Sequence, residues 1–151
     1  MINTAQKMIN LGKKLALILP KRSGTIYLKG DLGTGKTTLV RGIIQGLGYS
    51  GKIKSPSFSL IEYYPTSIPI AHLDLYRINS YEEIIELGIE EYLTNSYSII
   101  EWPEKGGNFI PPADLEIKIE MFPNSTRKLH WKFESNWGIE IKQKIDLYKI
   151  I

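Results

Sequence analysis

The residues best suited to chemistry in this sequence stand between Gly30 and Thr38. The stretch GDLGTGKTT fits the pattern G-x-x-x-x-G-K-[ST] without a mismatch. Its glycines let the main chain turn N–H groups inward toward an anion, and the amine of Lys36 adds a positive charge. The Thr37 hydroxyl is a hard oxygen of the kind that binds Mg²⁺. These residue types in this order predict a loop that binds the phosphates of a nucleotide.

Such a loop needs a strand before it and a helix after it, and the sequence predicts both. Residues 25–28 form a short apolar and β-branched run, and apolar residues recur at helical spacing from Thr37 to Leu47. Gly48 follows where a left-handed helix cap is needed. This context favours phosphate binding over a glycine-rich turn without a ligand. We expect Lys36 to face solvent. The residues expected to contact the nucleotide are Asp31, Leu32, Gly33, Thr34, Gly35, Lys36, Thr37 and Thr38.

Two acidic residues end predicted strands further along the chain. Asp74 ends an apolar run that begins near Ile68, and Glu101 ends the run that begins at Tyr97. Ligand-binding residues collect at the carboxyl ends of parallel strands, so both acids are expected beside the loop. Considered alone, an acidic residue at the end of a strand more often caps a helix or a turn. Beside a phosphate-binding loop, either acid could hold Mg²⁺ or orient the attacking water.

Three other side chains stand next to these motifs. Ser57, in a loop after Pro56, could reach a phosphate or its metal ion. His72 lies in an apolar strand, and two histidines in the chain cannot form a histidine metal cage, so we interpret His72 as structural. Trp102 could be a core residue, but because it adjoins Glu101 we expect its fluorescence to respond to bound Mg·ATP.

The order of elements predicts a three-layer α/β fold with a mainly parallel central sheet and a C-terminal β-hairpin. A capping box at Ser80 to Glu83 is expected to open the third helix. The predicted helices cover 4–19, 37–47, 80–87, 89–93 and 138–151, and the predicted strands cover 25–28, 58–64, 68–76, 97–101, 115–121 and 129–133.

Composition limits the class of protein. With 151 residues, 42% of them hydrophobic, we expect a single domain over 1–151. No apolar run approaches the ~20 residues of a membrane span, no secretory signal is recognisable, and cysteine is absent, so we expect a cytoplasmic protein. A net charge of +3 is too small to predict direct contact with nucleic acid.

Five motifs in order resemble the TsaE family, the bacterial ATPases of tRNA threonylcarbamoyladenosine biosynthesis. They are residues 30–38, 55–58 (SPSF), 72–77 (HLDLYR), 86–93 (ELGIEEYL) and 101–104 (EWPE). The resemblance runs from about Gly24 to Pro112. It implies a P-loop NTPase with ATP and Mg²⁺ as cofactors and with the TsaD and TsaB proteins as partners. It also implies that tRNA is reached through that complex.

The resemblance also assigns roles to individual residues. It implies that Thr37 and Glu101 serve Mg²⁺ and that Asp74 is needed for activity, so that Lys36, Asp74 and Glu101 form the catalytic set. Ser57 stands where the family usually has threonine, which preserves the hydroxyl.

The resemblance further implies that the C-terminal hairpin contributes to the nucleotide pocket. Its best match here is Thr126-Arg127. No arginine lies within the loop at 30–38 or within 55–58 or 101–103. Arg77, three residues after Asp74, could approach the phosphates, but we expect it to pair with an acid and hold its loop in place. We therefore expect slow ATP hydrolysis by the chain alone and faster hydrolysis with its partners.

Two other classes of protein carry the same kind of loop. A small-molecule kinase usually needs several arginines in a mobile lid, whereas the four arginines of this chain are far apart in sequence. A GTP-dependent switch usually carries an Asn-Lys-x-Asp motif, and this sequence has none. Both remain alternatives to the ATPase.

Overall fold

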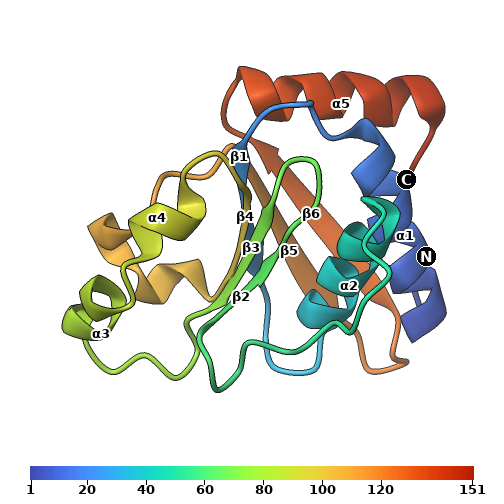
Figure 1. Cartoon of the computed structure of the whole chain (residues 1–151). Coiled ribbons are helices and arrows are strands. Elements are labelled where there is room, and N and C mark those ends of the chain that lie inside the picture. The colour runs from blue at the N-terminus through green and yellow to red at the C-terminus, as the bar shows by residue number, and fades with distance from the viewer.

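The computed structural model describes all 151 residues and is built around one six-stranded sheet (Figure 1). In chain order the strands are β1 (Gly24–Lys29), β2 (Ile61–Tyr64), β3 (Ile70–Asp74), β4 (Tyr97–Glu101), β5 (Leu115–Met121) and β6 (Arg127–Phe133). Their order across the sheet is β2-β3-β4-β1-β5-β6. The four inner strands are parallel, while β2 and β6 are antiparallel to their neighbours. The predicted α/β fold with a mainly parallel sheet and a C-terminal hairpin is confirmed.

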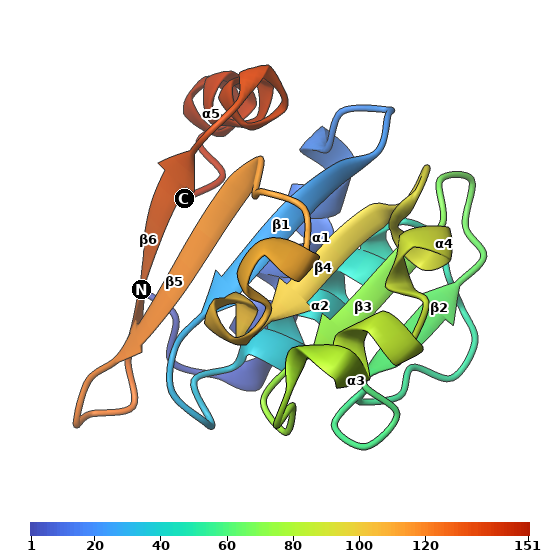
Figure 2. The same cartoon turned by 90° about the vertical axis from the view of Figure 1, so that its left-hand side faces the viewer.

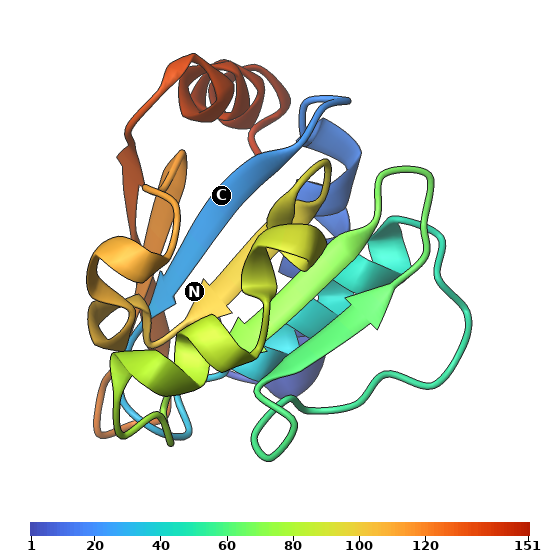
Figure 3. The same ribbon diagram turned by 60° about the vertical axis from the view of Figure 1, so that its left-hand side comes forward.

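Helices cover both faces of this sheet (Figure 2). One face carries α1 (Ala5–Ile18) and α2 (Lys36–Gly46), and the other carries the short α3 (Tyr81–Glu86) and α4 (Ile89–Leu93). The last helix, α5 (Asn136–Tyr148), packs with the hairpin and α1, so the C-terminal third occupies one edge of the sheet and β2 the other (Figure 3). Two 3₁₀ turns, η1 (Pro103–Lys105) and η2 (Gly107–Phe109), follow β4. None of the helices combines the length and the apolar character that crossing a membrane requires.

Alternation along the inner strands decides which side chains meet which helices. Leu73 and Ile100 belong to the small core cluster under α3 and α4. Successive strand residues point to opposite faces, so His72, Asp74 and Glu101 point toward the face covered by α1 and α2. The sheet therefore presents both acids and the histidine to the start of α2.

The two helices on that face touch through glycine. A β-carbon at Gly12 would lie 2.4 Å from the carbonyl oxygen of Leu39, and one at Gly42 would lie 2.2 Å from that of Ile9. Both distances are shorter than carbon and oxygen tolerate, so only glycine permits this approach. The close crossing brings the first turn of α1, capped by the Thr4 side chain, beside the loop that precedes α2.

Two local predictions from the sequence are wrong for reasons that the hydrogen bonds show. The strand predicted from residue 58 begins at Ile61, because the Leu60 N–H bonds to the Pro56 carbonyl in a turn that leaves Phe58 exposed. The predicted capping box is absent: the Ser80 side chain makes no cap bond, and the Glu83 carboxylate accepts the N–H of Asn79 instead.

Candidate nucleotide-binding site

The loop between β1 and α2 has the main-chain geometry that its glycines predict. Gly33 and Gly35 both have positive φ angles, 78° and 106°, which favour glycine. Gly35 is also the residue that caps α2, and a β-carbon there would lie 3.2 Å from Met8 Cε. The first N–H groups of a helix lack partners within the helix, so the start of α2 offers them, with the positive end of its dipole, to an anion.

Lys36 lies inside the curve of this loop. Its Nζ donates to the carbonyl oxygens of Gly30 at 2.7 Å and Asp31 at 2.8 Å, and it lies 4.8 Å from the centroid of the Trp102 ring. The side chain is only 5% exposed, so the prediction that it faces solvent is wrong. Burial lowers the pKa of Lys36, and the nearby carboxylate of Glu101 opposes part of that shift. Main-chain carbonyls of the loop thus hold the amine in place.

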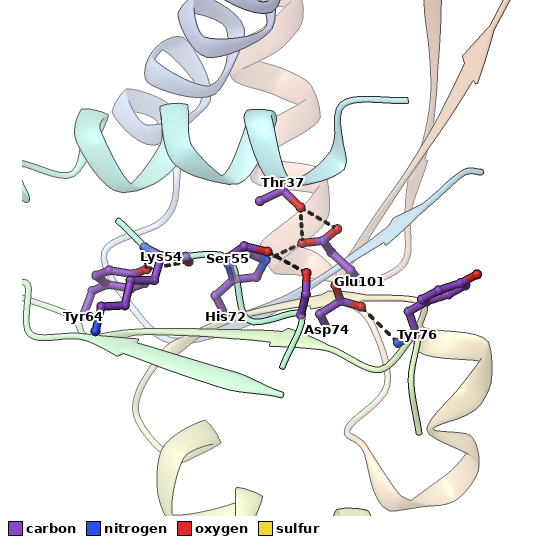
Figure 4. Close-up of polar contacts among 9 residues, drawn as sticks. Thr37, Lys54, Ser55, Tyr64, His72, Asp74, Tyr76 and Glu101 are labelled. Carbon is purple, nitrogen blue, oxygen red and sulfur yellow. Dashed lines mark hydrogen bonds and ion pairs between the residues drawn. The ribbon is translucent and has the colours of Figure 1, made fainter. Parts of the chain in front are cut away.

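The acids predicted at the ends of β3 and β4 lie side by side, because Asp74 and Glu101 are register partners in the parallel ladder. The Glu101 carboxylate is buried, and the Thr37 hydroxyl from α2 lies 3.1 Å from Oε1 and 3.0 Å from Oε2 (Figure 4). The structure therefore brings together the hydroxyl and the carboxylate that the sequence marked as metal ligands.

Asp74 has a different environment. Its Oδ1 accepts the main-chain N–H of Tyr76 at 3.0 Å, and the residue is 8% exposed (Figure 4). Burial raises the pKa of the Asp74 carboxyl, and the N–H of Tyr76 works against that shift. The negative charge of Glu101 raises the pKa of Asp74 further. Asp74 is therefore a better proton acceptor than an exposed aspartate.

The C-terminal hairpin reaches the same loop. Arg127 Nε donates to the carbonyl oxygen of Thr34 at 2.7 Å, so a guanidinium group lies beside the P-loop. Thr126 is turned elsewhere: its N–H and hydroxyl both bond to Asn124 Oδ1. Arg77 packs over the Phe58 ring, 4.5 Å from its centroid. The arginine next to the loop is thus Arg127, which the resemblance had placed in the pocket, whereas the expected ion pair of Arg77 with an acid is not formed.

These groups line a cavity of about 260 Å³. Every residue predicted to bind or act lines it except Asp31, Thr34 and Thr126. The hydroxyl of Thr34 donates back to the carbonyl of Asp31, within the loop itself.

Two lining residues were missed by sequence reasoning: Ala5 and Met8. Ala5 and Met8 belong to the first turns of α1, where nothing local separates them from residues that only pack. Trp102, which adjoins Glu101, both lines the cavity and packs against the smaller core cluster. Its main chain turns through a positive φ of 56°, and its ring lies over Lys36.

The donors present fit a magnesium ion that is shared with phosphates. Thr37 and Glu101 supply hard oxygens, which Mg²⁺ prefers. No group of three or more His, Cys, Asp or Glu side chains is arranged to hold a metal. Mg²⁺ usually keeps several waters and takes one or two protein ligands together with phosphate oxygens, so this small donor set suits it.

A glycine-rich loop between a parallel strand and a helix, with an acid at the end of the neighbouring strand, defines a P-loop NTPase. The family model described as threonylcarbamoyl adenosine biosynthesis protein TsaE matches residues 2–129. The chain therefore belongs to the TsaE family.

Individual proteins agree with this assignment. The chain is similar to proteins named tRNA threonylcarbamoyladenosine biosynthesis protein TsaE from two bacteria. The Haemophilus influenzae protein is 41% identical over 140 residues, which cover 89% of this chain and 88% of that protein. The Rickettsia bellii protein is 38% identical over 128 residues, which cover 83% of this chain and 88% of that protein. In fold it resembles YdiB from Bacillus subtilis, with a TM-score of 0.80 and 24% identity over 97% of this chain and 91% of that one.

Proposed function

We propose that this protein binds and hydrolyses ATP with Mg²⁺ as a subunit of the machinery that makes threonylcarbamoyladenosine in tRNA, acting with TsaD and TsaB. Membership of the TsaE family supports the pathway. The chemistry is supported by one observation: Thr37 Oγ1, in the first turn of α2, lies 3.1 and 3.0 Å from the two carboxylate oxygens of Glu101. The single continuous sheet supports treating residues 1–151 as one domain.

Each residue of the cavity has a proposed task. The N–H groups of the P-loop and the Lys36 amine bind the phosphates, and Thr37 and Glu101 hold the metal. When bound, Mg²⁺ would neutralise charge on the phosphates. Asp74 orients the attacking water through the oxygen that the Tyr76 N–H does not occupy. Ser57 is within the same cavity and is proposed to contact the terminal phosphate.

Arg127 supplies a second positive charge, but its Nε is engaged by the Thr34 carbonyl. Its Nη1 also donates to the carbonyl oxygen of Ser125, so part of the guanidinium is used by main-chain carbonyls and is not free to bind the phosphate in transfer. We therefore retain the proposal that the chain alone hydrolyses ATP slowly and that the TsaD–TsaB pair accelerates it. A well-placed arginine is worth about 10³–10⁵ in turnover, which sets the scale of the acceleration available.

The binding part of the proposal is tested by calorimetry with ATP and GTP, with and without Mg²⁺. We expect ATP to bind more tightly than GTP and Mg²⁺ to strengthen binding. Thr37→Val should abolish the response to Mg²⁺, whereas Thr37→Ser, which keeps the hydroxyl, should retain it. A preference for GTP would favour the regulatory switch.

The pathway is tested in a reconstituted reaction that contains TsaD, TsaB, tRNA and their substrates. Threonylcarbamoyladenosine in the tRNA is measured by mass spectrometry, and ATP turnover is measured alongside. Full modification without this protein would refute its role. Fast turnover by the lone chain, unchanged by the partners, would refute the proposed acceleration. Phosphate transfer to a small acceptor would favour a kinase.

A further inference from the structure

One buried histidine is not used by the chemistry proposed above. His72 lies on β3 and is 1% exposed. Its Nε2 is 2.6 Å from Glu101 Oε2, while its other ring nitrogen, Nδ1, is buried without a hydrogen-bond partner. Buried polar atoms in proteins are almost always paired, so an unpaired one needs an explanation. A leucine or methionine at this place would fill the space without that penalty.

The direction of the hydrogen bond follows from the two groups. An ionised carboxylate only accepts, so the imidazole must donate from Nε2. If Nδ1 also carried a proton, a donor would be buried without an acceptor, whereas a bare ring nitrogen leaves only a weaker acceptor unsatisfied. The contacts therefore fit a ring that donates from Nε2 to Glu101.

This bond restricts how the carboxylate can turn. The Thr37 hydroxyl has one proton and lies at nearly equal distances from both oxygens of Glu101, so it does not by itself select an orientation. His72 binds Oε2 alone. Figure 4 shows Glu101 between Thr37, which comes from α2, and His72, which comes from β3. The oxygen left to a metal beside Thr37 is then Oε1.

We propose that His72 is a positioning residue for the metal site: it holds Glu101 so that Oε1 and the Thr37 hydroxyl can bind one Mg²⁺ together. This inference rests on the proposed function and adds a residue to it. Partners that orient metal-binding side chains typically change metal affinity by about 10–100-fold when they are removed. The effect should fall on the metal and leave the contacts between the P-loop and the phosphates unchanged.

Three variants separate positioning from packing. In His72→Gln the side-chain amide nitrogen reaches about as far as Nε2, so the donor to Glu101 is kept. His72→Asn has an equally polar amide on a shorter side chain, so this amide lies near the position of Nδ1 and not near that of Nε2. His72→Leu has no donor. Binding of ADP is measured by calorimetry across a Mg²⁺ titration and again in excess chelator, with thermal unfolding of each variant.

We expect His72→Asn and His72→Leu to need about 10–100-fold more Mg²⁺ for the same gain in affinity. Their affinity for ADP in chelator should match that of the wild type, and His72→Gln should follow the wild type throughout. An unchanged Mg²⁺ requirement in His72→Asn would overturn the inference. An equal loss of affinity with and without metal would do the same, because it would indicate a purely structural role.

If His72→Leu fails to fold, the Gln and Asn pair decides the question, because the two amides differ in reach and not in polarity. A wild type that binds nucleotide with no response to Mg²⁺ would overturn the proposed function, and the inference with it. A wild type that responds to Mg²⁺, alongside variants that respond equally, would overturn the inference alone.

Discussion

Replacing Gly12 by alanine tests whether contact between α1 and α2 builds the nucleotide site. The added β-carbon would lie 2.4 Å from the Leu39 carbonyl oxygen and 2.8 Å from Gly42 Cα, so the two main chains must separate. The atoms in the way are main-chain atoms that cannot rotate aside, so the overpacking cost should fall in the upper part of the usual range, at about 2–3 kcal/mol. Alanine regains about 1 kcal/mol of helix propensity. We therefore expect a net loss of about 1–2 kcal/mol, or roughly 2–8 °C in melting temperature for a chain of this size.

The same change should weaken nucleotide binding, because α1 carries Ala5 and Met8 into the cavity. Thermal unfolding and calorimetry with ADP measure the two effects. Lys13→Ala is the matched control: it adds alanine at the neighbouring exposed position and should leave both values within error. A Gly12→Ala protein with unchanged or higher melting temperature and unchanged affinity would refute the reasoning, since it would mean that the helices do not depend on this contact.

Three other predictions concern the charged residues. Glu101→Gln should raise the Mg²⁺ needed for nucleotide binding more than Asp74→Asn does, and Asp74→Asn should mainly slow hydrolysis; the opposite pattern in calorimetry and turnover would reverse the assignment. Because burial raises the pKa of Asp74, ionisation of this carboxyl lowers the stability of the fold as the pH rises through its folded-state pKa. Asp74→Asn should therefore melt higher than wild type at neutral pH, and the difference should vanish below about pH 4, near the ordinary pKa of aspartate; equal melting curves at all pH values would contradict this. Lys36→Ala should lower ATP affinity about 10–100-fold through the loss of charge-assisted contacts, and unchanged affinity in a folded variant would contradict that role.

The sequence was most informative where local pattern and topology agree. The P-loop glycines, the strand before them and the helix after them are neighbours in the chain, so the pattern could predict their arrangement. Asp74 and Glu101 are distant in sequence, yet the rule that parallel strands present their carboxyl ends at one edge brought them to the loop. Their register pairing agrees with that rule.

Side-chain environments were less predictable, because they depend on contacts between distant segments. Lys36 was expected to face solvent since it lies in a polar loop, but the loop curls around its amine and Trp102 covers it. Arg127 was proposed for the pocket from resemblance alone, and nothing in the hairpin sequence separates it from its neighbour Thr126. The difference arises from the strand register, which turns Arg127 toward the Thr34 carbonyl.

The contribution of α1 to the site has a signal in the sequence, in two glycines. Gly12 and Gly42 both fall inside helices that the apolar spacing predicted, and glycine in a helix interior costs about 1 kcal/mol relative to alanine. A glycine retained there is explained when a second main chain passes too close for a β-carbon, and the structure has the two glycines facing each other. Two such glycines in helices on either side of the P-loop strand would have predicted that these helices cross. The crossing carries the start of α1 to the P-loop, which is the physical reason that Ala5 and Met8 line the nucleotide cavity.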